Sequence, residues 1–298
     1  LATSSAASDV YKRQIFFGGF VISSQGSLYL VATPIGNLED FSIRGIKVLS
    51  EVDLVLTENT HKSKTLLNKY EIKNKISLFN DFTPENKIDS LIEKILTGKN
   101  IAMISDAGTP LISDPGSEFV KKAIEKNIDV VPIPGASSVI SALIASGLKT
   151  ESFTFRGFLP KKEMPQINFL KEIKFKKETQ IFFESPKRIK KSLKNFQKVF
   201  EPERKIVLAR EMTKIYEEFY RGTIYEVVEK TDLSKVIEKG EYVILLDGTE
   251  KEEIFDSKNS EILFNELKPF MTLRQISKII SKVSTENSKE IYNFFKKK

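Results

Sequence analysis

The stretch that decides the fold is NIAMISDAGTPLISDPG, residues 100–116. Its first half, NIAMISD (100–106), is a short apolar run that predicts a buried strand. Its second half is a loop with Gly108 and Gly116, which let the backbone approach a ligand without a Cβ in the way. Two proline turns, Thr109-Pro110 and Asp114-Pro115, stiffen the loop. The pattern indicates either a ligand loop after a strand or a tight turn that only leads into the next helix.

The same strand-and-turn pattern recurs on both sides of this stretch. The further predicted strands are LYLVAT (28–33), DLVLTE (53–58) and DVVPIP (129–134). SEFVKKAIEKN (117–127) has apolar residues at helical spacing and predicts a helix between the last two strands. Strands that alternate with helices favour an α/β fold whose sheet is mostly parallel and covered on both faces.

Each of these strands ends in a cluster of small or polar residues. The clusters are 33–37, 58–60, 105–110 and 134–138. In an open parallel sheet, ligands bind outside the carboxyl ends of the strands, so we expect the clusters to share one crevice. The helix that opens at Ser137 and Ser138 either holds a carboxylate at its free N–H groups or packs closely on the sheet through its small residues.

A second region follows Gly147. Its predicted strands are FTFRGF (153–158), QIFFES (180–185), KIVLARE (205–211) and EYVILLDG (241–248), and basic helical segments connect them. After a polar linker at 250–260, LRQISKIISKV (273–283) and SKEIYNFFKKK (288–298) predict helices. We expect four parts: a non-native or disordered tail (1–26), an N-terminal α/β cofactor domain (27–147), a second α/β domain with a mixed sheet that completes the cleft (148–249), and a small helical domain (250–298).

The composition excludes several classes of site. The chain of 298 residues has no cysteine, which excludes disulfides, thiolate metal sites and a cysteine nucleophile. His61 is the only histidine, which argues against a histidine metal cluster or a serine triad and predicts a surface residue near a helix start. Neither G-x-G-x-x-G after the first strand nor a P-loop motif occurs. No apolar run approaches the roughly 20 residues of a membrane span.

The net charge of +7 has two possible causes. A basic balance favours a polyanionic partner such as nucleic acid. A general abundance of lysine in the sequence explains it equally well. Charge alone therefore decides nothing about function.

Several motifs resemble those of one known superfamily. They are residues 28–60, 104–116 and 130–143, followed by RGFLPKK (156–162), FFESPKR (182–188), LAREMTK (208–214) and KGEYVILLDG (239–248). These resemble the tetrapyrrole methylase superfamily, and within it the ribosomal RNA small-subunit methyltransferases. The resemblance covers residues 28 to about 295. It departs at Asn59-Thr60-His61, where the family reads D-T-R, and at Lys187, where histidine is common.

The resemblance implies a two-domain α/β methyltransferase that uses S-adenosyl-L-methionine. The implied reaction is 2′-O-methylation of a cytidine in the decoding region of 16S ribosomal RNA. The implied partners are 16S ribosomal RNA or the 30S subunit and a second copy in a homodimer, with no metal, no membrane and a cytoplasmic location. The resemblance also implies which residues hold the cofactor: Pro34, Ser105, Asp106, Ala107, Gly108, Thr109, Pro110, Asp114, Pro115, Gly116, Ser137 and Ser138.

Candidate catalytic residues lie at the strand ends of the second domain. Glu184 is a candidate general base, whereas Arg210, Glu211 and Lys214 are candidates to orient the ribose and contact phosphate. A salt bridge between Arg210 and Glu211 that only holds strand to helix is an equal alternative. Asn37 is a candidate RNA-binding residue. A basic, RNA-facing stripe, which an ordinary solvated helix face explains as well, consists of Lys161, Lys162, Lys187, Arg188, Lys190 and Lys191.

Two other functions stay open. One is a methylase of the same fold that acts on a tetrapyrrole or a protein side chain. The basic second domain and the C-terminal helices argue against this function. The other is a non-catalytic RNA-binding protein, against which the intact loop at 105–116 speaks.

Overall fold

The computed structural model describes residues 25–233, 239–250, 257–282 and 287–296. Contacts divide the chain into two compact units. Of the described residues, the first unit holds those up to Ala142 together with Arg210–Glu218, and the second holds Leu143–Ala209 and those from Phe219 onward. The four-part division expected from the sequence stays a prediction, and it does not anticipate that 210–218 joins the first unit.

The fold begins slightly before the predicted boundary. The backbone N–H of Gly26 donates to the carbonyl of Ile95 at 2.8 Å, and a Cβ on Gly26 would lie 2.1 Å from the carbonyl oxygen of Lys99. Gly26 is therefore packed into the first unit and is not part of a tail. The rest of the predicted tail, residues 1–24, lies outside the described residues.

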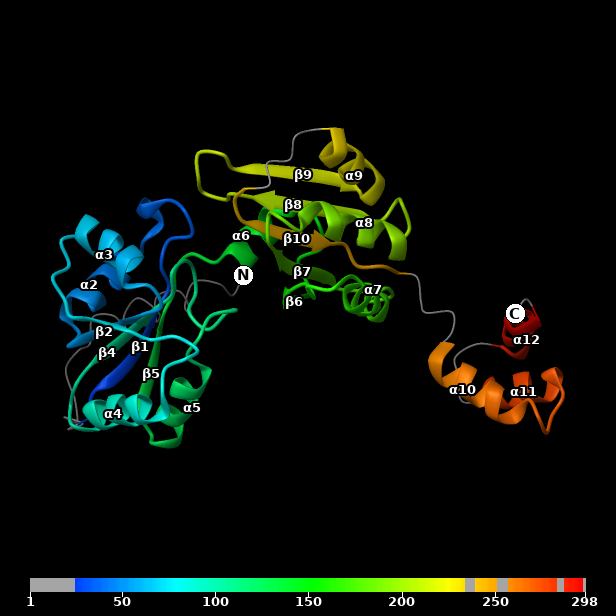
Figure 1. The fold of residues 1–298 in the computed structure, drawn as a ribbon, viewed down its shortest axis with the longest axis horizontal. Coiled ribbons are helices and arrows are strands. Elements are labelled where there is room, and N and C mark those ends of the chain that lie inside the picture. The colour runs from blue at the N-terminus through cyan, green and yellow to red at the C-terminus, as the bar shows by residue number, and fades with distance from the viewer. Residues whose placement is uncertain (1–24, 234–238, 251–256, 283–286, 297–298) are drawn as a thin grey trace, which may run out of the picture. The chain divides into compact units, whose positions relative to one another are not determined.

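The first unit is built on a parallel sheet of five strands, of which the sequence predicts four and the parallel pairing (Figure 1). The strand order is β3-β2-β4-β1-β5, and every neighbouring pair is parallel. The strands are β1 (Ser27–Val31), β2 (Leu54–Thr57), β3 (Ile76–Leu78), β4 (Ile101–Ile104) and β5 (Asp129–Ile133).

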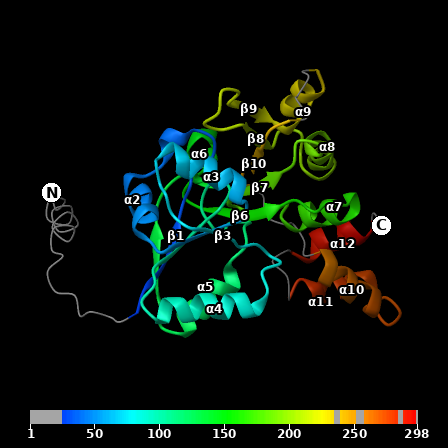
Figure 2. The same ribbon diagram turned by 60° about the vertical axis from the view of Figure 1, so that its left-hand side comes forward.

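Helices cover both faces of this sheet (Figure 2). The helices of the first unit and the one that leads out of it are η1 (Leu38–Asp40), α2 (Ile43–Glu51), α3 (Thr60–Lys69), α4 (Glu85–Leu96), α5 (Ser117–Glu125) and α6 (Ser138–Ser146). Helices α4 and α5 pack on one face of the sheet, and α2 and α3 pack on the other.

Strand β4 shows why the sheet needs cover on both sides. All four of its residues are buried. Ile101 and Met103 belong to the core under α4 and α5, whereas Ala102 and Ile104 belong to the core under α2 and α3. An apolar run without polar alternation is typical of a strand buried on both faces.

Strand β1 lies between β4 and β5, so the loops after β1, β4 and β5 leave the same edge of the sheet side by side. The carboxyl edge of an open parallel sheet is where ligands bind, at the point where the strand order reverses. The strand order therefore brings three of the four predicted clusters together, and β2, which pairs with β4, brings the fourth.

The second unit is built on a mixed sheet, as predicted, and the sequence predicts four of its five strands. The strand order is β6-β7-β10-β8-β9. Strands β6 and β7 are parallel, and β7 and β10 are antiparallel. Its elements are β6 (Phe153–Phe158), α7 (Glu163–Glu172), β7 (Thr179–Glu184), α8 (Ile189–Val199), β8 (Lys205–Arg210), β9 (Glu218–Thr223), α9 (Ile224–Leu233) and β10 (Tyr242–Leu246). Helices α7, α8 and α9 share one apolar core with the sheet.

The C-terminal helices are α10 (Ser257–Leu267), α11 (Leu273–Ile280) and α12 (Ser288–Lys296), which pack around a small apolar cluster (Figure 1). The prediction of a polar linker over 250–260 is wrong in its last four residues, because α10 starts at Ser257. A capping box between Thr272 and Gln275 fixes the start of α11. None of the helices in the described parts of the chain is long and apolar enough to cross a membrane.

Candidate functional site

The loops after β1 and β4 are joined by an isolated β-bridge. The N–H of Thr33 donates to the carbonyl of Gly108 at 2.9 Å, and the N–H of Gly108 donates to the carbonyl of Thr33 at 3.0 Å. The hydroxyl of Ser105 donates to the carbonyl of Gly108 at 3.0 Å. These bonds hold the predicted cofactor loop against the loop that contains Pro34.

The loop after β4 carries unusual backbone conformations. Gly108 and Gly116 have φ angles of 84° and 122°, and Leu111 and Ser113 have φ angles of 72° and 67°. Left-handed backbone costs a non-glycine residue roughly 1–2 kcal/mol and persists only where the surroundings fix it. The surroundings therefore fix the conformation of this loop, which is more constrained than a simple connection from β4 to α5 needs to be.

The loop after β5 joins the same cluster. The hydroxyl of Thr109 donates to the carbonyl of Ala136 at 3.2 Å. A Cβ on Gly135 would lie 3.0 Å from Cβ of Ala32, so glycine allows the two loops to approach. Ser137 accepts a weak hydrogen bond of 3.5 Å from the N–H of Ile140, and Ser138 is the first residue of α6.

A further loop, which lies after the predicted first domain in the sequence, also contacts the turn after β1. Residues 211–217, which connect β8 to β9, pack on the turn after β1. The N–H of Asn37 donates to the hydroxyl oxygen of Thr213 at 3.0 Å. Lys214 pairs with Glu211 at 2.9 Å. Three of the predicted catalytic residues, Arg210, Glu211 and Lys214, thus belong to the same unit as the predicted cofactor loops.

Arg210 does not form the salt bridge with Glu211 that the sequence suggested as an alternative to a catalytic role. Its Nη1 lies 3.5 Å from Oε2 of Glu218, whereas Glu211 pairs with Lys214. The side chain of Arg210 is 7% exposed. Among the described residues, its Nε has no hydrogen-bond partner. Arg210 is therefore a buried cation with one donor unsatisfied.

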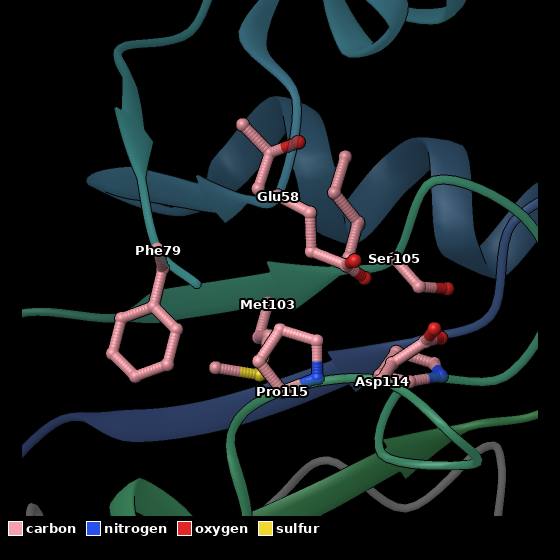
Figure 3. Close-up of a pocket in the computed structure, with 9 residues that line it drawn as sticks. Glu58, Phe79, Met103, Ser105, Asp114 and Pro115 are labelled. Atoms are coloured by element: carbon pink, nitrogen blue, oxygen red, sulfur yellow. The ribbon is translucent and has the colours of Figure 1, made fainter. Parts of the chain in front are cut away.

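A narrow pocket lies at the carboxyl ends of β2 and β4 (Figure 3). Its lining includes Glu58, Ser105 and Asp114, with the carboxyl group of Glu58 directed toward the other two. Pro110 and Pro115 of the predicted cofactor loop also line it. The pocket adds Glu58, which the sequence analysis placed only in a strand-end cluster.

Two carboxyl groups at this pocket, those of Glu58 and Asp114, have raised pKa values. Burial, together with the negative charges of Asp114 and Asp106, raises the pKa of Glu58 to about 7. Burial also raises the pKa of Asp114 to about 6, with a contribution from the charge of Asp106. Among the described residues, Oε1 of Glu58 and Oδ1 of Asp106 are buried without a hydrogen-bond partner. The other oxygen of Asp106 accepts from Lys62 at 2.9 Å.

The structure explains why Asn59 can stand where the family has aspartate, directly after Glu58. Asn59 is the N-cap of α3, and its side chain accepts from the N–H groups of His61 and Lys62. Asparagine and aspartate cap helices about equally well. His61 is exposed in the first turn of α3, as the sequence predicts.

Glu184 lies in the second unit and is fully engaged. Its Oε1 accepts from the N–H of Ser185 at 2.6 Å and pairs with Arg188 at 2.6 Å. Its Oε2 accepts from the hydroxyl of Ser192 at 2.5 Å. A buried carboxylate with three donors stabilises its own turn, so this geometry disfavours the predicted role as a base.

The predicted RNA-facing lysines are partly solvated. Lys161, Lys162 and Lys187 are exposed, and Lys190 is half-buried. Lys191 pairs with Glu163 at 3.0 Å. Two lysines lower the pKa of that carboxyl to about 2. Among the described residues, no group of three or more histidine, cysteine, aspartate or glutamate side chains is arranged to hold a metal ion.

Comparison with known proteins assigns the class. The family described as "Tetrapyrrole (Corrin/Porphyrin) Methylases" matches residues 27–228, more than half of the chain. The solved structure of a cobalt precorrin-4 methyltransferase aligns with a TM-score of 0.56 at 20% identity, over 77% of this chain and 98% of that one. A uroporphyrin-III C-methyl transferase from Thermus thermophilus, complexed with S-adenyl homocysteine, aligns with a TM-score of 0.50 at 16% identity, over 74% of this chain and 97% of that one. The protein is a methyltransferase of the tetrapyrrole methylase class.

Sequence comparison narrows the class further. A "Ribosomal RNA small subunit methyltransferase I" from Halalkalibacterium halodurans is 40% identical over 279 residues, which is 91% of this chain and 95% of that protein. The chain belongs to the ribosomal RNA small subunit methyltransferase I family.

Proposed function

We propose that this protein transfers the methyl group of S-adenosyl-L-methionine to the ribose 2′-hydroxyl of a cytidine in the decoding region of 16S ribosomal RNA. The observation that carries the proposal is the bonding of three strand-end loops to one another, through Thr33, Gly108 and Thr109, in a member of this family. Those loops contain the residues that resemble the cofactor loops of the family.

The charges around the loops fit such a donor. When bound, S-adenosyl-L-methionine supplies a methyl group on a positively charged sulfur and brings ammonium and hydroxyl donors. The strand ends offer acceptors: among the described residues, Oε1 of Glu58 and Oδ1 of Asp106 are buried without a hydrogen-bond partner. Asp106 and Asp114 would hold the polar, cationic part of the donor, and the loop backbone around Gly108 would lie against it.

Methyl transfer to a hydroxyl depends mainly on alignment. The ribose oxygen must approach the methyl group opposite the sulfur, which is positioning catalysis. The O–C bond forms as the S–C bond breaks, the sulfur keeps the electron pair, and the hydroxyl proton passes to solvent. Lys214 and Arg210, which share a unit with the donor loops, would favour the developing negative charge on that oxygen. We assign Glu184 no part in this step, because its buried carboxylate already accepts from three donors in its own turn.

Four lysines of the second unit, three of them exposed and Lys190 half-buried, support an RNA substrate. Lys161 and Lys162 precede α7, and Lys187 and Lys190 flank the start of α8. We propose that they contact phosphates of 16S ribosomal RNA or of the 30S subunit. A homodimer and a cytoplasmic location, which the family resemblance implies, are parts of the same proposal.

Mapping of ribose methylation tests the proposal directly. Purified protein and labelled S-adenosyl-L-methionine are incubated with 16S ribosomal RNA and with 30S subunits, and 2′-O-methyl positions are located by primer extension at low nucleotide concentration. We expect one new stop, at a cytidine of the decoding region, in at least one substrate. Label on a ribosomal protein of the 30S subunit instead of RNA would favour the alternative same-fold methylase, and no transfer despite donor binding would contradict the proposal.

A further inference from the structure

The loop 211–217 leaves the second sheet, packs on the first unit and returns. It starts at the end of β8 and ends at the start of β9, but its contacts assign it to the first unit. Its partner there is the turn Ile35–Asn37, which follows β1 and precedes η1. The contact joins two segments that lie 176 positions apart in the sequence.

Two independent features show that this contact is close. The N–H of Asn37 donates to the hydroxyl oxygen of Thr213 at 3.0 Å. A Cβ on Gly36 would lie 2.4 Å from Cγ of Lys214, 2.7 Å from Oγ1 of Thr213 and 2.9 Å from the carbonyl oxygen of Met212. Such distances leave no room for any side chain at position 36.

The loop holds its shape at a conformational cost. Glu211 and Thr213 have φ angles of 48° and 64°, which β-branched threonine rarely adopts. The side chain of Glu217 accepts from the N–H of Thr213 at 2.6 Å, and the N–H of Glu217 donates to the carbonyl of Lys214 at 3.0 Å. These bonds fix the hydroxyl of Thr213 in front of Asn37.

The turn that Thr213 holds leads directly to the donor loop. Ile35 is buried, and a Cβ on Gly108 would lie 3.2 Å from its Cγ2. A shift of the turn would therefore move Ile35 against Gly108. Packed side chains transmit such shifts because interiors are dense.

We propose that Thr213 is a positioning residue, which fixes the Ile35–Asn37 turn and through it the loop that binds the methyl donor. The inference rests on the proposed donor site. It assigns to the loop between β8 and β9 a role in donor affinity that is separate from contact with RNA.

The test compares Thr213→Val with Thr213→Ser. Valine keeps the β-branched shape and the same backbone strain but lacks the hydroxyl acceptor, whereas serine keeps the acceptor. Calorimetric titration with S-adenosyl-L-methionine should give a Kd about three- to tenfold higher for Thr213→Val, the effect of one lost hydrogen bond. We expect Thr213→Ser to stay within about twofold of the unmodified protein, and RNA retention on a filter to be unchanged in both variants.

Two further variants complete the test. Thr223→Val removes a hydroxyl that accepts from the N–H of Glu226 in the second unit, and it should not change the donor Kd. Thr213→Gly, which fits a φ of 64° without strain and also lacks the hydroxyl, replaces Thr213→Val if that variant does not fold. Equal donor affinity in Thr213→Val and the unmodified protein, or equal loss in the serine and valine variants, would overturn the inference. No binding to the unmodified protein would instead count against the proposed donor site.

Discussion

Thr33 and Gly108 pair with each other through both of their backbone hydrogen bonds, although 75 positions separate them. This bridge lies beyond the ends of β1 and β4, where the two strands no longer pair. It extends the sheet at the point where the proposed donor binds. The first prediction follows from the conformation that the bridge imposes on Gly108.

Gly108→Val should abolish donor binding. The φ angle of 84° is unfavourable for a β-branched residue, and the new side chain would press on Ile35. Calorimetry should detect no binding of S-adenosyl-L-methionine, whereas RNA retention on a filter should stay within about twofold. Gly147→Val is the matched control, because Gly147 has a φ of 76° but no atom within 4 Å of a new Cβ. Unchanged donor affinity in Gly108→Val would remove this loop from the site.

Glu58→Gln should stabilise the protein at high pH only. The pKa of Glu58 is raised from 4.5 to about 7, so the folded state binds more protons than the unfolded chain within that window. Stability is therefore lost as the pH rises through the window, and the penalty is complete above it. Because the carboxyl is only partly buried, solvent screens the penalty, and we expect a Tm gain of about 2–4 °C at pH 8.

The Tm gain of Glu58→Gln is tested by comparing melting curves at pH 8 and at pH 4. At pH 4 the melting curves of Glu58→Gln and the unmodified protein should coincide, because both side chains are then uncharged. Glu125→Gln, on the exposed side of α5, should show no gain at pH 8. A gain of the same size at both pH values would mean that packing, and not charge, causes it.

Glu184→Gln should reduce stability and leave catalysis nearly intact. The change removes the charge that Arg188 and Ser192 bind, and we expect a loss of about 1–3 kcal/mol in urea denaturation. Ser192→Ala, which removes a donor from the same carboxylate, should act in the same direction. A general base contributes about 100-fold or more to the rate. A fall of kcat of that size in folded Glu184→Gln would therefore show that the base prediction is right.

Lys161→Ala combined with Lys162→Ala should weaken RNA binding in a salt-dependent way. Each lost phosphate contact reduces the slope of log K against log salt by about 0.7–0.9. Filter binding at several salt concentrations measures the slope for the double variant and for Lys126→Ala, an exposed lysine at the end of α5. Identical slopes in the double variant and the control would show that the lysines before α7 do not contact RNA.

Local patterns predict the strands well and the loops poorly. The sequence predicts β6 with the bounds that the structure gives. It predicts β1, β2, β4, β5, β7, β8 and β10 to within two residues at either end, because each is a bounded apolar run. It does not predict β3, which has three residues, or β9, whose sequence EFYRGT is mostly polar. Strands of this kind form through their neighbours in the sheet.

The site is predicted as a set of loops but not as a geometry. The glycines at 108 and 116 mark left-handed backbone, whereas Leu111, Ser113, Glu211 and Thr213 adopt it without any signal in their residue types. The raised pKa of Glu58 depends on Asp106 and Asp114, which come from another strand end. Such properties arise from tertiary contacts, and no local pattern contains them.

The loop 211–217 belongs to the first unit, although it follows residues 143–209 of the second unit in the sequence. A fragment that ends at Gly147 would therefore lack a piece of its own surface, with Gly36 and the N–H of Asn37 left uncovered. Neither unit can be excised by a single cut, because the first unit is assembled from two separate stretches of the sequence.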